Sequence, residues 1–294
     1  MIDVLQGVHV QQTVLGNGFV RLVDCMPRLI STPPDGSPLR ADVRIVESAR
    51  VSYAGASSRL STDEGLVRYL MRHQHTTPFE MVKFTFVIKM PLFIARQHFR
   101  HRMANINEIS GRYSVLEDEF YVPRQVYKQS KQNNQGSSVE ACDDDIQELF
   151  QQYLWDQMNG YRQYSALVHT HDVAKETARI GLPQNIMTQF YWTVDLHNLF
   201  HYLKLRMDSH AQYEIREYAN AIAMLIRPIV PVAYQAFEDY VLHQVVLTGP
   251  EVRLFREQQG TLPTKREQRE WEEKKAKLGL SSENPIKNEP FERM

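Results

Sequence analysis

Hydrogen-bonding side chains are concentrated between residues 96 and 113 of this sequence. Four arginines, two histidines, two asparagines, a glutamate and a serine fall within these eighteen residues, directly after an apolar stretch. Guanidinium groups bind phosphate and carboxylate oxygens bidentately, which a lysine ammonium cannot do. A solvated basic turn, with Arg100, His101 and Arg102 paired to Glu108, is the simpler alternative. It leaves the other polar residues unexplained, so the stretch predicts a local anion site.

Composition limits the classes of protein that this chain can belong to. With 294 residues and 43% hydrophobic content, the chain can bury a substantial core, and its net charge of −1 argues against a global basic field for nucleic acid. The two cysteines, Cys25 and Cys142, have no CxxC spacing, which favours a reducing cytoplasm. The N-terminus shows no basic region before an apolar one, and no stretch approaches the ~20 apolar residues of a membrane span. We expect a cytoplasmic protein with no membrane association.

The elements that would position the polar stretch follow from hydrophobic periodicity. Val82, Phe84, Phe86, Ile88 and Met90 alternate with polar residues and predict a strand with one buried face. The periodicity predicts further strands over 18–26 and 186–194, and helices over 41–50, 61–73, 143–158, 175–180, 195–203, 209–227 and 232–243. Capping and breaking residues predict a box from Ser61 to Glu64, a cap at Asp195 and a division of the long helix at Gly160. One α+β domain is expected, in which the polar stretch begins on a helix and continues into a loop.

Two polar segments are set apart from this domain. Residues 128–138 are low in complexity and predict a mobile insertion, about 128–142 in extent, without a chemical role. After Gly249 the composition becomes rich in charge, and a solvated helical tail is expected over 249–294. Residues 1–248 would then form the main domain, which carries the polar stretch.

The order of residues from Arg100 to Ser110, Arg-His-Arg and seven residues before the serine, resembles the signature of flavin-dependent thymidylate synthases. Asn105 departs from it, because many relatives have serine there. Five separated blocks are similar to blocks of the same family, in the same order: Ala49–Ser52, His75–Glu80, Arg96–Arg102, Glu176–Arg179 and Leu205–Gln212. The resemblance covers the chain from about Ala49 to Tyr240.

The resemblance implies a mixed or antiparallel β-sheet flanked by long helices, and a methyltransferase that converts dUMP to dTMP. The carbon donor would be 5,10-methylenetetrahydrofolate, and NADPH would reduce the FAD that supplies the hydride. It also implies a homotetramer with active sites between subunits. The FAD contacts it implies are Ser52, His75, Thr77, Glu80, Arg100, His101, Arg102, Glu108, Asp195, Leu196, His197 and His201. The dUMP contacts it implies are Gln97, Arg100, Glu108, Ser110, Gly111, Arg112, Arg179 and Arg206, of which Arg206 is the catalytic residue that polarises the uracil ring around N3.

Other interpretations of the same residues remain. His197 and His201 have the i, i+4 spacing of zinc ligands, but the glutamate of an HExxH motif is missing, so no metal is expected. No GxGxxG or Walker A sequence is present, which disfavours a Rossmann or P-loop nucleotide site. A nucleic-acid-binding protein is a second possibility, against which the net charge weighs. A flavoprotein of the same fold without synthase activity is a third. Neither cysteine has a neighbouring histidine to activate it, so neither is expected to be a nucleophile.

Overall fold

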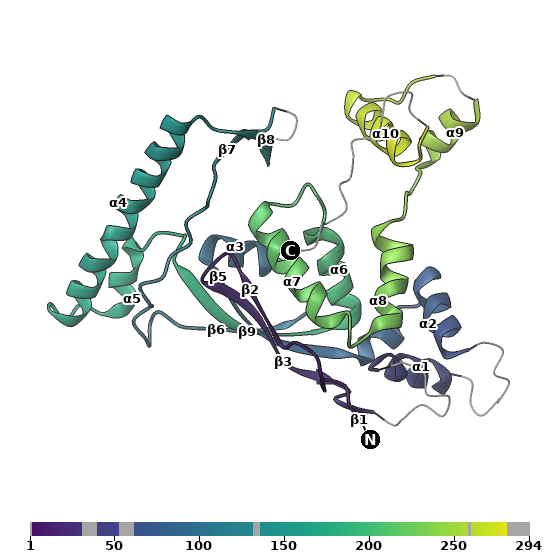
Figure 1. Ribbon diagram of the computed structural model, residues 1–294, viewed down its shortest axis with the longest axis horizontal. Helices are drawn as coiled ribbons and strands as arrows, with labels where there is room; N and C mark the ends of the chain where they lie inside the picture. The colour runs from purple at the N-terminus through teal and green to yellow at the C-terminus, as the bar shows by residue number, and fades with distance from the viewer. Residues whose placement is uncertain (1, 31–39, 53–61, 132–135, 258–259, 281–294) are drawn as a thin grey trace. The chain divides into compact units, whose positions relative to one another are not determined.

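The computed structural model describes residues 2–30, 40–52, 62–131, 136–257 and 260–280. The chain divides into two compact units, Met1–Phe237 and Glu238–Met294 (Figure 1). The first unit contains the described strands, and its structure is given first.

A five-stranded antiparallel sheet forms the centre of the first unit, as expected for an α+β protein. Its strands, in spatial order, are β2 (Gln11–Val14), β3 (Gly18–Met26), β5 (Lys83–Pro91), β9 (Met187–Asp195) and β6 (Asn105–Glu108). A separate two-stranded sheet joins β1 (Ile2–Asp3) to β4 (Leu29–Ile30). The polar stretch was expected to be a loop after its helix, but part of it is the edge strand β6, because its backbone pairs with β9.

The face of β5 predicted to be apolar is buried. Phe84, Phe86, Ile88 and Met90 are each 0% exposed, and Trp192 of β9 stands directly opposite Phe86. Burial of each such side chain stabilises the fold by roughly 1.5–3 kcal/mol. The strand prediction for this segment is therefore confirmed.

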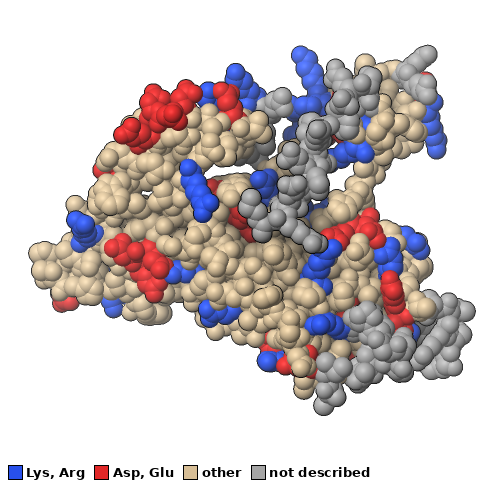
Figure 2. Space-filling view, viewed as in Figure 1, with Lys and Arg blue, Asp and Glu red and all other residues tan. Residues whose placement is uncertain are grey.

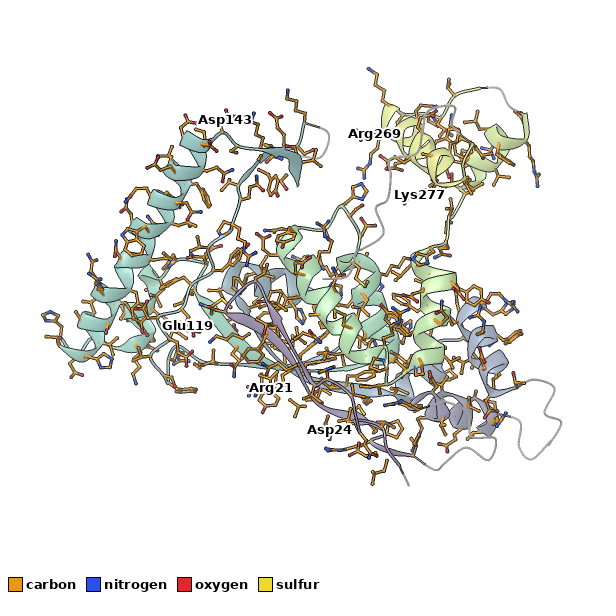
Figure 3. The ribbon with its side chains drawn as sticks, viewed as in Figure 1. Arg21, Asp24, Glu119, Asp143, Arg269 and Lys277 are labelled. Carbon is orange, nitrogen blue, oxygen red and sulfur yellow. The ribbon has the colours of Figure 1, made fainter. Side chains whose placement is uncertain are left out.

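A register shift changes the expected pattern of β3. Val20 and Leu22 are buried, but the pairing with β5 shifts between Leu22 and Asp24. The extra residue of a bulge moves the following side chains to opposite faces. Cys25 is consequently buried while Asp24 is exposed, and Figure 3 shows Arg21 and Asp24 pointing away from the helices.

Three helices cover one face of the sheet: α3 (Leu92–His98), α6 (Leu196–Arg206) and α7 (Tyr213–Ile226) (Figure 1). The helix predicted over 195–203 buries an apolar stripe, in which Leu196, Leu199 and Leu203 are each 0% exposed. The helix expected from Ser209 begins only at Tyr213, since residues before it form turns. The covered face is therefore the core, and α3 and α6 are fixed against it.

A second group of helices packs beside this layer: α1 (Asp42–Val51), α2 (Asp63–Arg72), the 3₁₀ helix η1 (Thr77–Met81) and α8 (Pro231–Phe237). The buried carboxylate of Asp42 accepts the backbone N–H groups of Val232 and Ala233, each at 3.0 Å. These N–H groups belong to the first turn of α8. The N–H groups of a first turn have no carbonyl acceptors within their own helix. Asp42 thus ties α1 to α8.

Two expected details of the helices differ in the structure. Thr62 caps α2 through its hydroxyl, whereas the capping residue was expected to be Ser61, which lies outside the described residues. Helix α4 (Asp144–His169) continues through Gly160 without division, because no partner crowds the helix there and one glycine costs it only ~1 kcal/mol. Figure 2 shows acidic side chains gathered at the start of α4, at the positive end of the helix dipole.

The segment predicted as a mobile insertion contains an antiparallel pair, β7 (Tyr127–Gln129) with β8 (Ser137–Ala141). Residues 132–135, between these strands, lie outside the described part. After α4 come α5 (Lys175–Ala178) and the 3₁₀ turn η2 (Arg179–Gly181). These two short elements carry Glu176 and Arg179.

The second unit consists, in its described part, of the π-helical turn η3 (Glu238–Leu242), α9 (Gly249–Glu257) and α10 (Lys265–Lys277). The nearly buried carboxylate of Glu251 pairs with Lys274 at 2.7 and 2.8 Å, and Trp271 packs inside. Among the described helices of both units, none is long and apolar enough to cross a membrane.

Candidate active site

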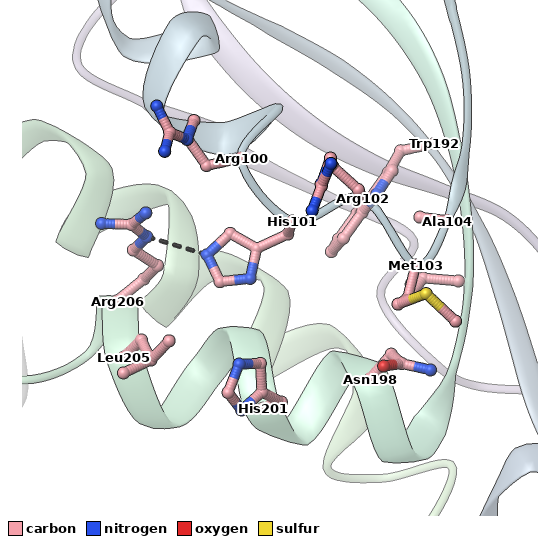
Figure 4. Close-up of a pocket in the computed structure, with 11 residues that line it drawn as sticks. Arg100, His101, Arg102, Met103, Ala104, Trp192, Asn198, His201, Leu205 and Arg206 are labelled. Atoms are coloured by element: carbon pink, nitrogen blue, oxygen red, sulfur yellow. Dashed lines mark hydrogen bonds between the residues drawn. The ribbon is translucent and has the colours of Figure 1, made fainter.

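An open pocket of about 700 Å³ lies where the end of α3 faces α6 (Figure 4). Pockets of 300–1,000 Å³ are the usual size for small-molecule sites. It is lined by Arg100, His101, Arg102, Met103, Ala104, Trp192, Val194, Asn198, His201, Leu205 and Arg206. Five predicted ligand contacts thus come together in one place: Arg100, His101, Arg102, His201 and Arg206.

The local sequence explains why these side chains meet. Asp195 ends β9 and caps α6, its carboxylate accepting Asn198 N–H at 2.9 Å and the Asn198 side-chain amide at 2.8 Å. The chain therefore turns directly from the sheet into α6. Asn198, His201 and Leu205 follow at helical spacing and share one face of α6. The predicted cap at Asp195 is confirmed.

Arg206 is oriented by two contacts. Its Nε donates to Nε2 of His101 at 3.0 Å (Figure 4). Its Nη2 donates to the backbone oxygen of Gln97 at 3.3 Å. Because Nε2 accepts, the proton of a neutral His101 lies on Nδ1. The remaining guanidinium N–H groups of Arg206 have no acceptor among the residues that the structure describes, so they can bind a ligand.

His101 is held neutral by its surroundings. Burial, and then the positive charge of Arg206 and the nearby His201, lower the pKa of His101 to about 4. At neutral pH this imidazole therefore donates and accepts hydrogen bonds without carrying charge. The fixed positive charge of the pocket comes from arginine.

Arg100 and Arg102 are exposed at the rim of the pocket. No acceptor within the described part of the chain binds either guanidinium group. Unpaired guanidinium groups beside an open pocket fit phosphate oxygens. The indole Nε1 of Trp192, which lines the same pocket, is buried and also has no described acceptor.

A second group of predicted contacts surrounds the start of α5. Arg112 pairs with Glu176 at 3.1 Å, and the Ser110 hydroxyl accepts the Arg112 backbone N–H at 3.3 Å. Gly111 is buried against Arg179, whose Cδ would lie 3.2 Å from an added Cβ. These residues are not part of the lining of the pocket between α3 and α6.

The other predicted residues are dispersed over the first unit. Glu108 accepts the Thr188 hydroxyl at 2.6 Å, and Gln97 bonds to the Gln212 amide. Leu196 is buried at the start of α6, and its neighbour His197 is half-buried. Ser52, His75, Thr77 and Glu80 lie at the end of α1, after α2 and on η1.

Several pocket residues were not predicted. Asn198 lies three residues before His201 on α6, so helical spacing from His201 was a usable signal. Trp192 and Val194 belong to the alternating strand and were interpreted only as core. Glu176, the partner of Arg112, stood in a matched block but was given no role. No group of three or more metal-ligating side chains lies within the described ranges.

The fold and pocket define an α+β protein with an open pocket lined by arginine and histidine side chains. Residues 37–232 match the family model described as thymidylate synthase complementing protein. The chain belongs to this family, that of the flavin-dependent thymidylate synthases, and it is a flavin-dependent methyltransferase.

Individual relatives agree with this assignment. The flavin-dependent thymidylate synthase of Dictyostelium discoideum is 50% identical over 280 residues, covering 94% of this chain and 90% of that protein. That of Thermus thermophilus is 47% identical over 243 residues, covering 83% and 84%. Among solved structures, a UMP/dUMP methylase, PolB, from Streptomyces cacaoi bound with 5-Br UMP has a TM-score of 0.65 at 30% identity. The match covers 78% of this chain and 97% of that one.

Proposed function

We propose that this thymidylate synthase converts dUMP to dTMP by reductive methylation in de novo dTMP synthesis. The carbon donor is 5,10-methylenetetrahydrofolate, the flavin is FAD, and NADPH is the reductant. The catalytic domain is residues 1–248 and the enzyme works in the cytoplasm. The observation that carries the proposal is the pocket in which Arg206 and His101 meet two arginines that have no acceptor in the described part of the chain, in a chain of this family.

The donor set of the pocket fits FAD. Arg100 and Arg102 supply guanidinium groups for a pyrophosphate, and Asn198 and His201 supply polar edges on α6. When bound, reduced flavin supplies the hydride, while the chain supplies binding and orientation. The proposed FAD contacts are Ser52, His75, Thr77, Glu80, Arg100, His101, Arg102, Glu108, Asp195, Leu196, His197 and His201.

Arginine groups also suit the recognition of dUMP. Hydrogen bonds from Nε and Nη2 fix the orientation of the Arg206 guanidinium group. Its other N–H groups can therefore point at the edge of the uracil ring around N3. A preorganised positive charge of this kind stabilises the negative charge that develops as C5 becomes nucleophilic. The proposed dUMP contacts are Gln97, Arg100, Glu108, Ser110, Gly111, Arg112, Arg179 and Arg206.

The chain's cysteines have no part in this mechanism. Burial, with help from the nearby Asp24 carboxylate, raises the pKa of Cys25 to about 12. The thiol also donates to the backbone oxygen of Pro27 at 3.4 Å, and a protonated thiol is a poor nucleophile. Cys142 precedes the acidic start of α4 and does not line the pocket.

We further propose a homotetramer whose sites lie between subunits. The arginines around α5 are separate from the pocket between α3 and α6, so one chain presents parts of more than one site. Tyr113 and Ile180, beside Arg112 and Arg179, are each 79% exposed. Large apolar side chains exposed around a polar site are typical of an interface.

The test is an absorption spectrum of the purified protein, followed by assays of dUMP conversion with NADPH and methylenetetrahydrofolate. A yellow protein that forms dTMP only with both co-substrates is expected. A colourless protein that cannot be reconstituted with FAD would refute the proposal. Retention of FAD without dUMP turnover would identify a flavoprotein that has lost the activity. A variant with Cys25→Ala and Cys142→Ala retains turnover if no thiol adduct is needed.

A further inference from the structure

We propose that Tyr202 is a positioning residue for Arg206, acting through His98 and His101. The inference rests on the role proposed above for Arg206. Tyr202 and Arg206 are one turn apart on α6, so their side chains leave the same face of that helix. Both contact the end of α3 and the residues that follow it.

Tyr202 lies between two imidazoles. Its ring centroid is 4.9 Å from that of His98 and 4.8 Å from that of His101, with the His101 ring nearly perpendicular to it. Its hydroxyl oxygen is 3.1 Å from Nδ1 of His98. Tyr202 and His98 are both 0% exposed, so water does not compete for this contact.

The direction of the buried hydrogen bond follows from counting donors and acceptors. Burial lowers the pKa of His98 to about 3, so the ring is neutral, and burial raises the pKa of the Tyr202 phenol. If the hydroxyl donates to Nδ1, the Nε2–H of His98 is the one group of this pair that lacks a partner among the described residues. The opposite direction would leave both the hydroxyl proton and Nε2 unsatisfied, which costs more. The hydroxyl therefore donates, and it orients His98 against the indole of Trp192, 4.4 Å away.

The second contact of this helix face is made by Arg206 itself. It donates to Nε2 of His101 and to the backbone oxygen of Gln97. Both acceptors of Arg206 belong to residues within three positions of His98 in the chain, and one of them, His101, also lies against the Tyr202 ring. Long side chains lose considerable rotamer freedom on being fixed, and an error of 1 Å in placement costs up to about a hundredfold in rate. The buried tyrosine thus determines where the half-buried arginine points.

The first experiment compares Tyr202→Leu, which removes the ring, with Tyr202→Phe, which removes only the hydroxyl. Phe200→Leu is the matched control, because Phe200 is also buried on α6 but stacks on Phe237 at 4.3 Å, away from His101. The affinity of flavin-loaded enzyme for dUMP is measured by calorimetry, beside the thermal midpoint. We expect about tenfold weaker binding for Tyr202→Leu, about threefold for Tyr202→Phe and no change for the control. Equal weakening in Phe200→Leu would mean that general destabilisation explains the effect, and would overturn the inference.

A double-mutant cycle with Arg206→Ala separates positioning from a structural role. If Tyr202 acts through Arg206, adding Tyr202→Leu to Arg206→Ala weakens dUMP binding no further. The same loss in both backgrounds overturns the inference and leaves the role of Arg206 intact. An Arg206→Ala enzyme that binds and methylates dUMP like the wild type overturns both. If Tyr202→Leu does not fold, Tyr202→Phe replaces it in the double-mutant cycle. Its threefold effect on dUMP binding is then expected to vanish in the Arg206→Ala background.

Discussion

The Nε atom of Arg206 lies 3.0 Å from Nε2 of His101, so a fixed cation donates to an imidazole nitrogen that must lack a proton. The contact makes protonation of His101 unfavourable and fixes its tautomer. It also joins α6 to the polar stretch that follows α3. His101 thereby stays neutral over the physiological pH range, and Arg206 carries the charge of the pair.

The first prediction concerns the free energy of unfolding as pH falls. The pKa of His101 is about 4 in the folded chain against 6.5 ordinarily. Between these values the unfolded chain binds a proton here and the folded chain does not, so stability is lost as pH falls from 6.5 towards 4. Because His101 is partly exposed, we expect it to contribute only about 1–2 kcal/mol of this loss between pH 7 and 5. Urea unfolding of the ligand-free protein measures it.

His101→Gln is the control for that prediction. The glutamine side chain offers an oxygen to Arg206 but does not titrate. The free energy of unfolding of the variant should therefore depend less on pH, between 7 and 5, than that of the wild type. Burial lowers the pKa of His98 to about 3, so His98 also makes the protein less stable as pH falls. This contribution has the same sign in the wild type and in the variant. Identical slopes for wild type and variant would contradict the assignment to His101.

The second prediction is that Arg206→Lys loses most turnover. A lysine ammonium cannot donate to His101 and the Gln97 oxygen while presenting a planar pair of N–H groups. Loss of one preorganised donor typically costs about 10²-fold in kcat. Steady-state dTMP formation is the measurement, and Arg266→Lys is the control, since Arg266 pairs with Glu270 on the exposed surface of α10. Turnover within threefold of wild type in Arg206→Lys would remove Arg206 from the catalytic role.

The third prediction tests the residues around α5. A Cβ on Gly111 would lie 3.2 Å from Cδ of Arg179 and 3.4 Å from Leu116, so Gly111→Ala displaces the arginine by a few tenths of an ångström. The KM for dUMP should rise about three- to tenfold while the thermal midpoint changes little. Gly160→Ala, in open space inside α4, should instead stabilise the protein by about 0.5–1 kcal/mol with unchanged KM. An unchanged KM in Gly111→Ala would separate Arg179 from dUMP.

Much of the fold was predictable where the periodicity of side chains reports burial on one face. Phe84 to Met90 and Leu196 to Leu203 show this directly, because β5 and α6 each bury one face completely. The pattern failed at β6, where the four residues from Asn105 to Glu108 are all exposed. Their strand conformation comes from backbone pairing with β9, which side-chain periodicity cannot report.

The site was predictable in its residue types more than in its grouping. Arginine and histidine at close spacing indicated an anion site, and matched blocks indicated the family. Neither signal indicates that Arg206 donates a hydrogen bond to His101, because the two residues are 105 positions apart in the chain. The Tyr202–His98 contact was equally invisible, since either residue alone is ordinary core sequence.

The last prediction concerns sharing of sites between subunits. If Arg206 and Arg179 of one site come from different chains, each single alanine variant is inactive but the two complement each other. Random mixing of subunits leaves about a quarter of the sites with both arginines, so about a quarter of wild-type activity should return. Co-expressed Arg206→Ala and Arg179→Ala chains are purified by two different tags and assayed, with each variant alone as control. Mixed oligomers without activity would mean that one chain supplies both arginines to each site.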